Sequence, residues 1–251
     1  MVAYDLQARQ APCIAAITPI LLVAATAIPG FAETKLTAGS IGLLVFVALQ
    51  FVAMRLVRSA GLTRQQDLFR DWGGKPTTTM LRHRDTRLNP LNKIRFHDLL
   101  RRLGPGYPIP TADEETRDPD DADIKYDAAM NEIRIRAKSK GITAVQKENT
   151  NYGAARNLYA LKSFGIFMCA ISVGSLALLI ATRDRFAPNP LEIVVFLAIA
   201  TIASLWIFAC TKEMVKRQAE AYASTLIENI ELILSHPQKA DGSVGLFISR
   251  P

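Results

Sequence analysis

The stretch SFGIFMCAISVGSLALLIAT, residues 163–182, carries no charged side chain. A bilayer core about 30 Å thick is crossed by roughly 20 residues of α-helix, at about 1.5 Å per residue. Three other runs without Asp, Glu, Lys or Arg have a comparable length: residues 11–32, 37–54 and 193–211. Buried core helices of a soluble protein are the alternative, but four charge-free runs in one chain favour membrane spans.

The four runs are grouped in pairs, and this grouping suggests how the chain is organised. We predict a predominantly α-helical, polytopic membrane protein with four transmembrane helices in two hairpins, a helical cytoplasmic insert and a cytoplasmic C-terminal helix. The predicted parts are a first hairpin over residues 1–57, a basic insert over 58–160 with an acidic loop at 113–127, a second hairpin over 161–211, and a helical tail over 212–251.

Basic residues near the ends of the spans predict the orientation, because cytoplasmic flanks carry an excess of Lys and Arg. The flanks that follow the second and fourth runs are rich in them: Arg55, Arg58, Arg64, Arg70, Lys212, Lys216 and Arg217. The connection between the first two runs carries only Lys35, beside Glu33. Both termini and the insert are therefore predicted to face the cytoplasm.

The first run has a second interpretation, as a cleaved signal peptide. Gly30-Phe31-Ala32 is similar to a signal-peptidase site, and Arg9 could supply the positive N-terminal region. Against cleavage, Asp5 lies in the same region, and the apolar run is longer than the usual 7–15 residues or so. We therefore expect the first span to be retained, and the intact mass of the purified protein distinguishes the two interpretations.

The insert changes charge along its length. Asn89 and Pro90 predict the N-cap and first residue of a helix. The apolar stripe predicted for this helix is Leu91, Ile94, Leu99, Leu100 and Leu103. The acidic residues of 113–127 are interpreted as a solvated loop that neutralises basic neighbours of the same domain, with an interaction tail as the alternative.

A basic cluster in the insert is the candidate ligand-binding site. Its predicted members are Lys75, Arg82, Arg84, Arg87, Lys93, Arg95, Arg101 and Arg102. A solvated face, or attraction to anionic lipid head groups, explains many clusters of this kind. Arginine outnumbers lysine here, and the guanidinium group suits bidentate recognition of phosphate. Together with the nearby aromatic residues Phe96, Tyr107 and Tyr126, this predicts a nucleotide or a short nucleic acid as the ligand.

No catalytic or metal-binding pattern stands out, and neither an enzyme nor a cofactor is predicted. Gly73-Gly74-Lys75-Pro76-Thr77 departs from a phosphate-binding P-loop, because Pro76 stands where Ser or Thr is required. Cys13, Cys169 and Cys210 lie in the apolar runs without the spacing of zinc ligands. The few polar residues of the runs are candidates for lining a pore: Gln50, Ser172, Ser175 and Ser204. With no ionisable group inside them, the runs fit a passive pore or a structural anchor better than a coupled transporter.

The segment Glu148-Asn149-Thr150-Asn151-Tyr152-Gly153-Ala154-Ala155-Arg156-Asn157-Leu158, just ahead of the third run, resembles a segment of small membrane proteins from bacterial anti-phage defence loci. The two hairpins and basic insert are also similar to those effectors, most of all to the Hailong membrane effector family. Membrane effectors of cyclic-oligonucleotide systems and the membrane component of Kiwa are neighbouring alternatives.

The resemblance implies a homo-oligomeric, channel-like protein of the bacterial inner membrane, held closed by a nucleic-acid ligand that a partner nucleotidyltransferase makes. We therefore expect an effector of abortive infection in which ligand state sets ion conduction and opening depolarises the cell. Tyr152, Arg156 and Asn157 are the candidates for coupling the ligand to the third span, although snorkelling of Arg156 to head groups is the simpler interpretation. A non-conducting anchor, or a sensor that recruits a soluble partner, is the alternative function.

Overall fold

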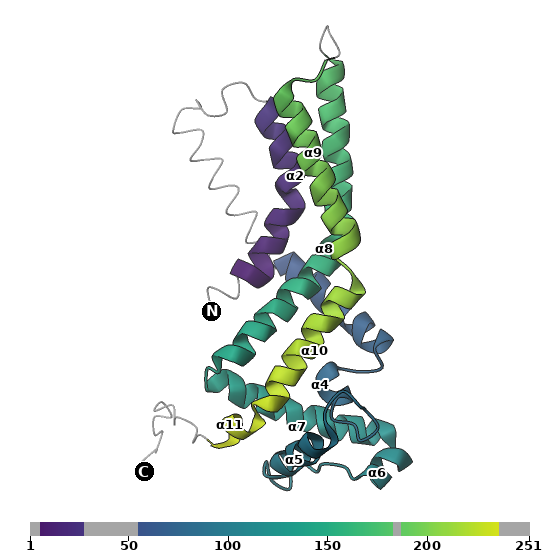
Figure 1. Ribbon diagram of the computed structural model, residues 1–251, viewed down its shortest axis with the longest axis vertical. Coiled ribbons are helices and arrows are strands. Elements are labelled where there is room, and N and C mark those ends of the chain that lie inside the picture. Colours follow the sequence, from purple (N-terminus) through teal and green to yellow (C-terminus); the bar gives the residue numbers. More distant parts are fainter. Residues whose placement is uncertain (1–5, 28–54, 183–186, 236–251) are drawn as a thin grey trace, which may run out of the picture. The chain divides into compact units, whose positions relative to one another are not determined.

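The computed structural model describes residues 6–27, 55–182 and 187–235, and within them every regular element is a helix (Figure 1). These residues divide into two compact units. Unit 1 is Met1–Gly73 with Glu148–Ala219, and unit 2 is Gly74–Lys147 with Glu220–Pro251. The predicted all-helical class is confirmed for the described residues.

Three helices are long and apolar enough to cross a membrane: Leu6–Thr26, Thr143–Ala181 and Pro190–Ala209. They correspond to the first, third and fourth predicted spans. The second predicted span, residues 37–54, lies outside the described residues, as do residues 28–32 of the first. The structure thus bears on three of the four predicted spans.

Unit 1 is built from the three long helices and a shorter one. The first comprises a π-helical turn, η1 (Leu6–Gln10), and α2 (Ala11–Ala27). A helix over residues 55–71 follows. Most of α8 (Thr143–Ala181) belongs to this unit, as do α9 (Pro190–Ser204), the π-helical η2 (Leu205–Ala209) and the start of α10 (Lys212–Glu228).

The helices of unit 1 share a buried apolar core, but many of their large apolar side chains are exposed. Ala16, Cys169 and Ile199 lie in its buried core. Phe167 and Phe208, in contrast, are 57% and 78% exposed. Exposed apolar surface of this extent is unusual for a protein in water but is ordinary for helices that face lipid.

Unit 2 is formed by short helices around its own apolar core. It contains α4 (Pro76–Thr79), α5 (Pro90–Arg101), α6 (Ala112–Arg117), α7 (Pro119–Ser139), the first turn of α8, the end of α10 and α11 (Ile230–Ser235). Leu100, Tyr126, Ile133 and Ile227 are fully buried at its centre.

Several local predictions for unit 2 are confirmed. The Asn89 side chain accepts a hydrogen bond from the Leu91 amide at 2.9 Å and caps α5, with Pro90 in the first turn. Val215, Leu226 and Ile230 of the C-terminal helices are also buried.

The predicted acidic loop at 113–127 is wrong, since its residues form α6 and the first half of α7. Thr111 and Glu114 form a capping box that starts α6, and the Asp118 side chain caps α7. Negative side chains in the first turn of a helix are favoured by the helix dipole. The acidic composition therefore marks two helix starts.

The predicted stripe of α5 is also partly wrong. Leu91 and Ile94 are 77% and 60% exposed. The buried face instead carries Lys93, Phe96, His97 and Leu100, which recur at i, i+3, i+4 and i+7. Two polar residues occupy core positions here, which a purely apolar pattern does not detect.

Candidate functional site

Acidic residues of α6 and α7 hold three of the predicted ligand-binding cations. Lys75 Nζ lies 2.7 Å from an Asp127 carboxylate oxygen, and Arg82 Nε donates to Asp123 at 2.8 Å. Arg84 Nε lies 4.0 Å from the buried carboxylate of Glu115. The prediction that the acidic stretch neutralises basic neighbours of its own domain is confirmed by these pairs.

Lys93 is a buried structural cation. Its ammonium group donates to the backbone carbonyl of Arg82 at 2.8 Å and also to that of Asp85. Burial lowers the Lys93 pKa from its ordinary value. This amine closes the turn that joins α4 to α5 and is not presented to solvent.

Arg87 joins three segments of unit 2. Its guanidinium group lies against Asp85, donates to Thr79 Oγ1 at 2.7 Å, and pairs with Glu220 of α10 at 2.8 Å. Arg95 pairs in the same way with Glu231 of α11. Both arginines therefore attach the C-terminal helices to the insert.

The carboxylate of Glu115 is the centre of a buried polar cluster. It accepts hydrogen bonds from the His83 amide at 2.7 Å and from the Tyr126 hydroxyl at 3.1 Å. The His97 ring stacks on Tyr126, and its Nε2 lies 2.8 Å from the Leu81 carbonyl oxygen. Burial lowers the pKa of His97 to about 4 and raises that of Tyr126. The sequence pattern suggests that these acidic residues are solvated, yet Glu115 is only 3% exposed.

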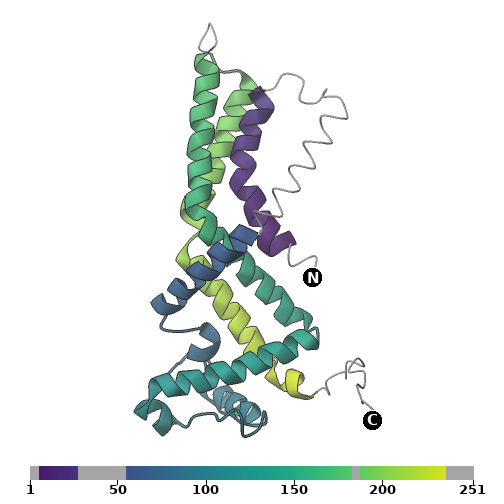
Figure 2. The ribbon, with the colours of Figure 1, turned by 180° about the vertical axis from the view of Figure 1, so that it is seen from behind.

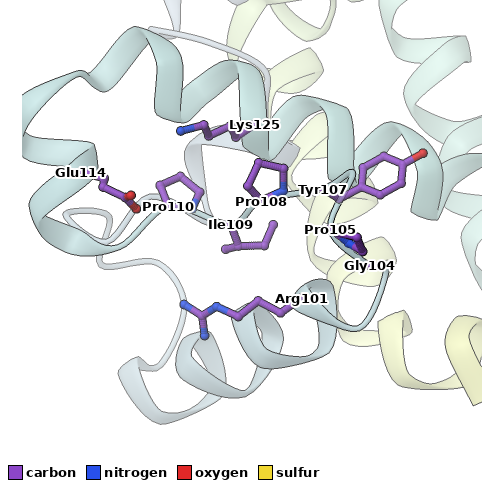
Figure 3. Close-up of a pocket in the computed structure, with 9 residues that line it drawn as sticks. All are labelled: Arg101, Gly104, Pro105, Tyr107, Pro108, Ile109, Pro110, Glu114 and Lys125. Carbon is purple, nitrogen blue, oxygen red and sulfur yellow. The ribbon is translucent and has the colours of Figure 1, made fainter.

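An open pocket of about 450 Å³ lies on unit 2 (Figure 3). Its floor is the loop after α5, and its walls come from α5, α6 and α7. The lining residues are Arg101, Gly104, Pro105, Tyr107, Pro108, Ile109, Pro110, Glu114 and Lys125. Figure 3 shows Arg101 and Lys125 on opposite sides of Ile109.

Each of the two cations of this pocket forms an ion pair with a carboxylate of its own helix. Arg101 Nη1 lies 2.6 Å from Asp98, and Lys125 Nζ lies 2.6 Å from Asp121, each pair within one helix. The hydrogen bond to Asp121 raises the Lys125 pKa, so this amine is charged at neutral pH. Ion pairs between side chains about one turn apart on a helix contribute about 0.3–0.5 kcal/mol, so a stronger anion can displace them.

The pocket brings together only part of the predicted set. Of the predicted cations only Arg101 lines it, while its chain neighbour Arg102 is exposed and has no ion pair in the part of the chain that the structure describes. Lys125 was missed because it lies in the acidic segment, where a single lysine gives no signal. The packing of α7 beside the loop 104–110 brings Lys125 to the pocket.

The three coupling candidates lie buried on α8, within unit 1. The Asn157 side-chain amide donates to the Ala8 carbonyl at 2.6 Å, and Arg156 Nη1 donates to Gln65 Oε1 at 2.5 Å. Pro12 lacks the amide hydrogen that would normally bond the carbonyl four residues earlier, which explains why Ala8 accepts from a side chain. The Arg156 guanidinium also lies 5.8 Å from the centre of the Tyr152 ring.

The pore candidates are only partly described. Ser172 and Ser204 donate to carbonyls of their own helices, those of Met168 at 2.7 Å and Ala200 at 2.9 Å. Ser175 is half-buried, and Gln50 lies outside the described residues. Within the described residues, no group of three His, Cys, Asp or Glu side chains could hold a metal ion.

Comparison with known proteins gives no relative from which a site could be transferred. No family model, no curated protein and no solved structure matches the chain. The interpretation of the pocket and of the buried contacts on α8 therefore depends only on their geometry in this structure.

Proposed function

We propose that this chain is a bacterial inner-membrane effector of anti-phage defence, a homo-oligomeric, channel-like protein whose state is set by a nucleotide or short nucleic acid bound to unit 2. The observation that carries the proposal is the open pocket between Arg101 and Lys125, in a unit distinct from the candidate membrane helices. The resemblance of residues 148–158 to defence effectors supports it independently.

The chemistry of the pocket suits a phosphorylated ligand with an apolar part. Arginine binds phosphate through two parallel N–H groups, and a lysine on the opposite wall adds a second positive charge. Between them, Ile109 and the prolines offer an apolar surface. A pocket of 300–1,000 Å³ or so is typical for small ligands, and this one falls in that range.

The ligand site that we propose is smaller than the predicted basic cluster. Lys75, Arg82 and Lys93 are engaged by carboxylates or carbonyls of unit 2. Binding a ligand with these groups would first break contacts that hold the unit together. Of the predicted cluster only Arg101 lines the pocket, and Lys125 of α7 adds the second cation of the proposed site.

A second function, a non-conducting anchor that recruits a soluble partner, is supported by a separate observation. The Ser172 and Ser204 hydroxyls bond carbonyls of their own helices, so one copy of the chain offers few polar groups to line an ion path. An oligomer could line a path with backbone and small side chains, whereas an anchor needs no such lining.

Binding is tested on the full chain in nanodiscs, with ATP and a short oligonucleotide as probes. Arg101→Glu and Lys125→Glu should each weaken binding about tenfold or more, since a charge-assisted hydrogen bond contributes roughly 1.5–3 kcal/mol. Arg134→Glu and Lys138→Glu change the same charge on exposed positions of α7 outside the pocket and serve as controls. Equal affinity in all four variants would contradict the pocket as the ligand site.

Conduction is tested separately, by ion flux from liposomes that contain the purified chain, with and without the probe that binds best. A flux that depends on the probe, and that Arg101→Glu makes independent of it, supports the effector. Binding without flux under any condition favours the anchor.

A further inference from the structure

The helix over residues 55–71, which belongs to unit 1, has one buried face and one exposed face. Val57, Gly61 and Leu68 are buried, and they recur at intervals of four and seven residues. Arg55, Arg58 and Leu62 recur at i, i+3 and i+7 on the opposite face and are exposed. The helix is therefore amphipathic, with an outer face that mixes leucine and arginine.

Two contacts fix this helix beside α8. A Cβ added at Gly61 would lie 2.1 Å from Asn157 Oδ1, so the two helices touch at this glycine. One turn later, Gln65 accepts the hydrogen bond from Arg156. The charge-free part of α8 begins at Ser163, about two turns after Arg156. Figure 2 shows the helix crossing the base of the long helices of unit 1.

Some arginines of this helix form ion pairs within it and others do not. Arg64 and Arg70 both lie near Asp67, at 4.0 and 2.9 Å. Arg55 and Arg58 have no ion pair within the described part of the chain. They are also the first charged residues after the apolar run 37–54.

The leucines on the outer face are unusually open. Leu62 shares the face of Arg55 and Arg58 and is 44% exposed, and Leu56, next to Arg55 in the chain but about 100° round the helix, is 65% exposed. Exposed leucine next to arginine is typical of a helix that lies in the head-group layer, where leucine enters the acyl boundary and arginine meets phosphate. A face turned to water would gain nothing from these leucines.

We propose that residues 55–62 form a binding site for anionic phospholipid, in which Arg55 and Arg58 bind the head-group phosphates and Leu56 and Leu62 contact the acyl chains. The charge of the face, its leucines and its attachment beside the charge-free part of α8 all favour this occupant. The site belongs to unit 1, and it is independent of the nucleotide pocket proposed for unit 2.

The test titrates the detergent-solubilised full chain with phosphatidylglycerol or phosphatidylcholine and counts bound lipids by native mass spectrometry. The wild type should prefer phosphatidylglycerol. Arg55→Gln/Arg58→Gln should lower the apparent affinity for it about 25-fold, since each basic residue near an anionic surface contributes about fivefold. Affinity for phosphatidylcholine should stay unchanged, which also shows that the variant is folded.

Two matched variants sharpen the test. Arg55→Lys/Arg58→Lys should keep most of the preference, because a lysine also meets a head-group phosphate as a point charge. Arg134→Gln/Lys138→Gln removes the same charge from unit 2 and should change nothing. The assignment is overturned if the wild type binds both lipids equally, if the glutamine variant retains its preference, or if millimolar inorganic phosphate displaces the lipid.

Discussion

In unit 2 most of the bulky apolar side chains lie inside, whereas in unit 1 many of them lie outside. Leu100 and Ile133 of unit 2 are completely buried. Phe196 and Leu178 of unit 1 are 46% and 66% exposed, while Gly165 and Ala16 occupy its helix contacts. Water drives large apolar groups inward in unit 2. The helices of unit 1 are long and apolar enough to cross a membrane, and lipid would give no such drive, which leaves close packing of small residues to hold the helices together.

The polar groups differ in the same way. In unit 2, carboxylates and cations form pairs that tie α4, α5 and α7 together, with Glu115 buried at their centre. In unit 1, the buried polar contacts cluster on α8 at Arg156 and Asn157. Unit 2 should therefore depend on charge and pH, and unit 1 on the size of residues at helix contacts.

The largest effect is expected from removing the buried carboxylate of unit 2. Glu115→Ala leaves the His83 amide and the Tyr126 hydroxyl without their acceptor and should destabilise unit 2 by about 3–5 kcal/mol. Hydrogen exchange of the α6 and α7 peptides measures this loss. Asp113→Ala, at an exposed position on the same helix, is the control and should change exchange little. Equal protection in both variants would show that the Glu115 cluster does not hold the unit.

Acid should act on unit 2 through His97. Its folded pKa of about 4 lies below the ordinary value of 6.5, so the unfolded chain binds the proton more readily. Stability is therefore complete above pH 6.5 and falls as the pH drops toward 4, by up to about 3 kcal/mol. Unfolding measured across this range for the wild type and for His97→Phe isolates the effect as the difference between the two curves. Parallel curves would mean that folding does not change the His97 pKa.

Packing should dominate unit 1, with a somewhat smaller effect. A Cβ at Gly165 would lie 2.3 Å from the Trp206 ring, so Gly165→Ala should cost about 1–3 kcal/mol. Gly174→Ala is the matched control, because a Cβ there meets nothing within 4 Å. Trp206 fluorescence during thermal unfolding in detergent follows both variants. A loss of similar size at Gly174 would remove the contrast between a tight and an open helix face.

The smallest effect is expected at the exposed pair of Arg95 and Glu231, whose side chains are 59% and 56% exposed. Arg95→Gln should destabilise unit 2 by about 0.5 kcal/mol or less, because solvent screens such pairs. Arg82→Gln should cost more, since the Arg82 and Asp123 side chains are only 14% and 29% exposed. Hydrogen exchange under matched conditions ranks the two, and an inverted ranking would contradict the role assigned to burial.

The sequence predicts the features that depend on local order. Charge-free runs identify the three long helices, and Asn89-Pro90 places the start of α5. Each of these needs only neighbours a few positions away.

The features that the sequence did not predict depend on distant partners. Lys93 is buried because carbonyls eight and eleven residues earlier surround its amine. Glu115 is buried because Tyr126 and the His83 amide face it. Acidic composition suggests a loop, but caps at Thr111 and Asp118 turn it into helix starts. The pocket could not be anticipated, since Lys125 and Arg101 meet only after α5 and α7 pack.

The bond between Asn157 and the Ala8 carbonyl has a consequence for biosynthesis. The two residues are separated by 149 positions, and a ribosome that adds about 5–20 residues per second needs about 7–30 s to travel between them. During that interval the first helix already exists, but the amide that its carbonyl will accept has not been made. Until α8 is made, water or another donor must satisfy this carbonyl. The order of synthesis therefore separates the formation of the first helix from the contact that Asn157 later makes with it.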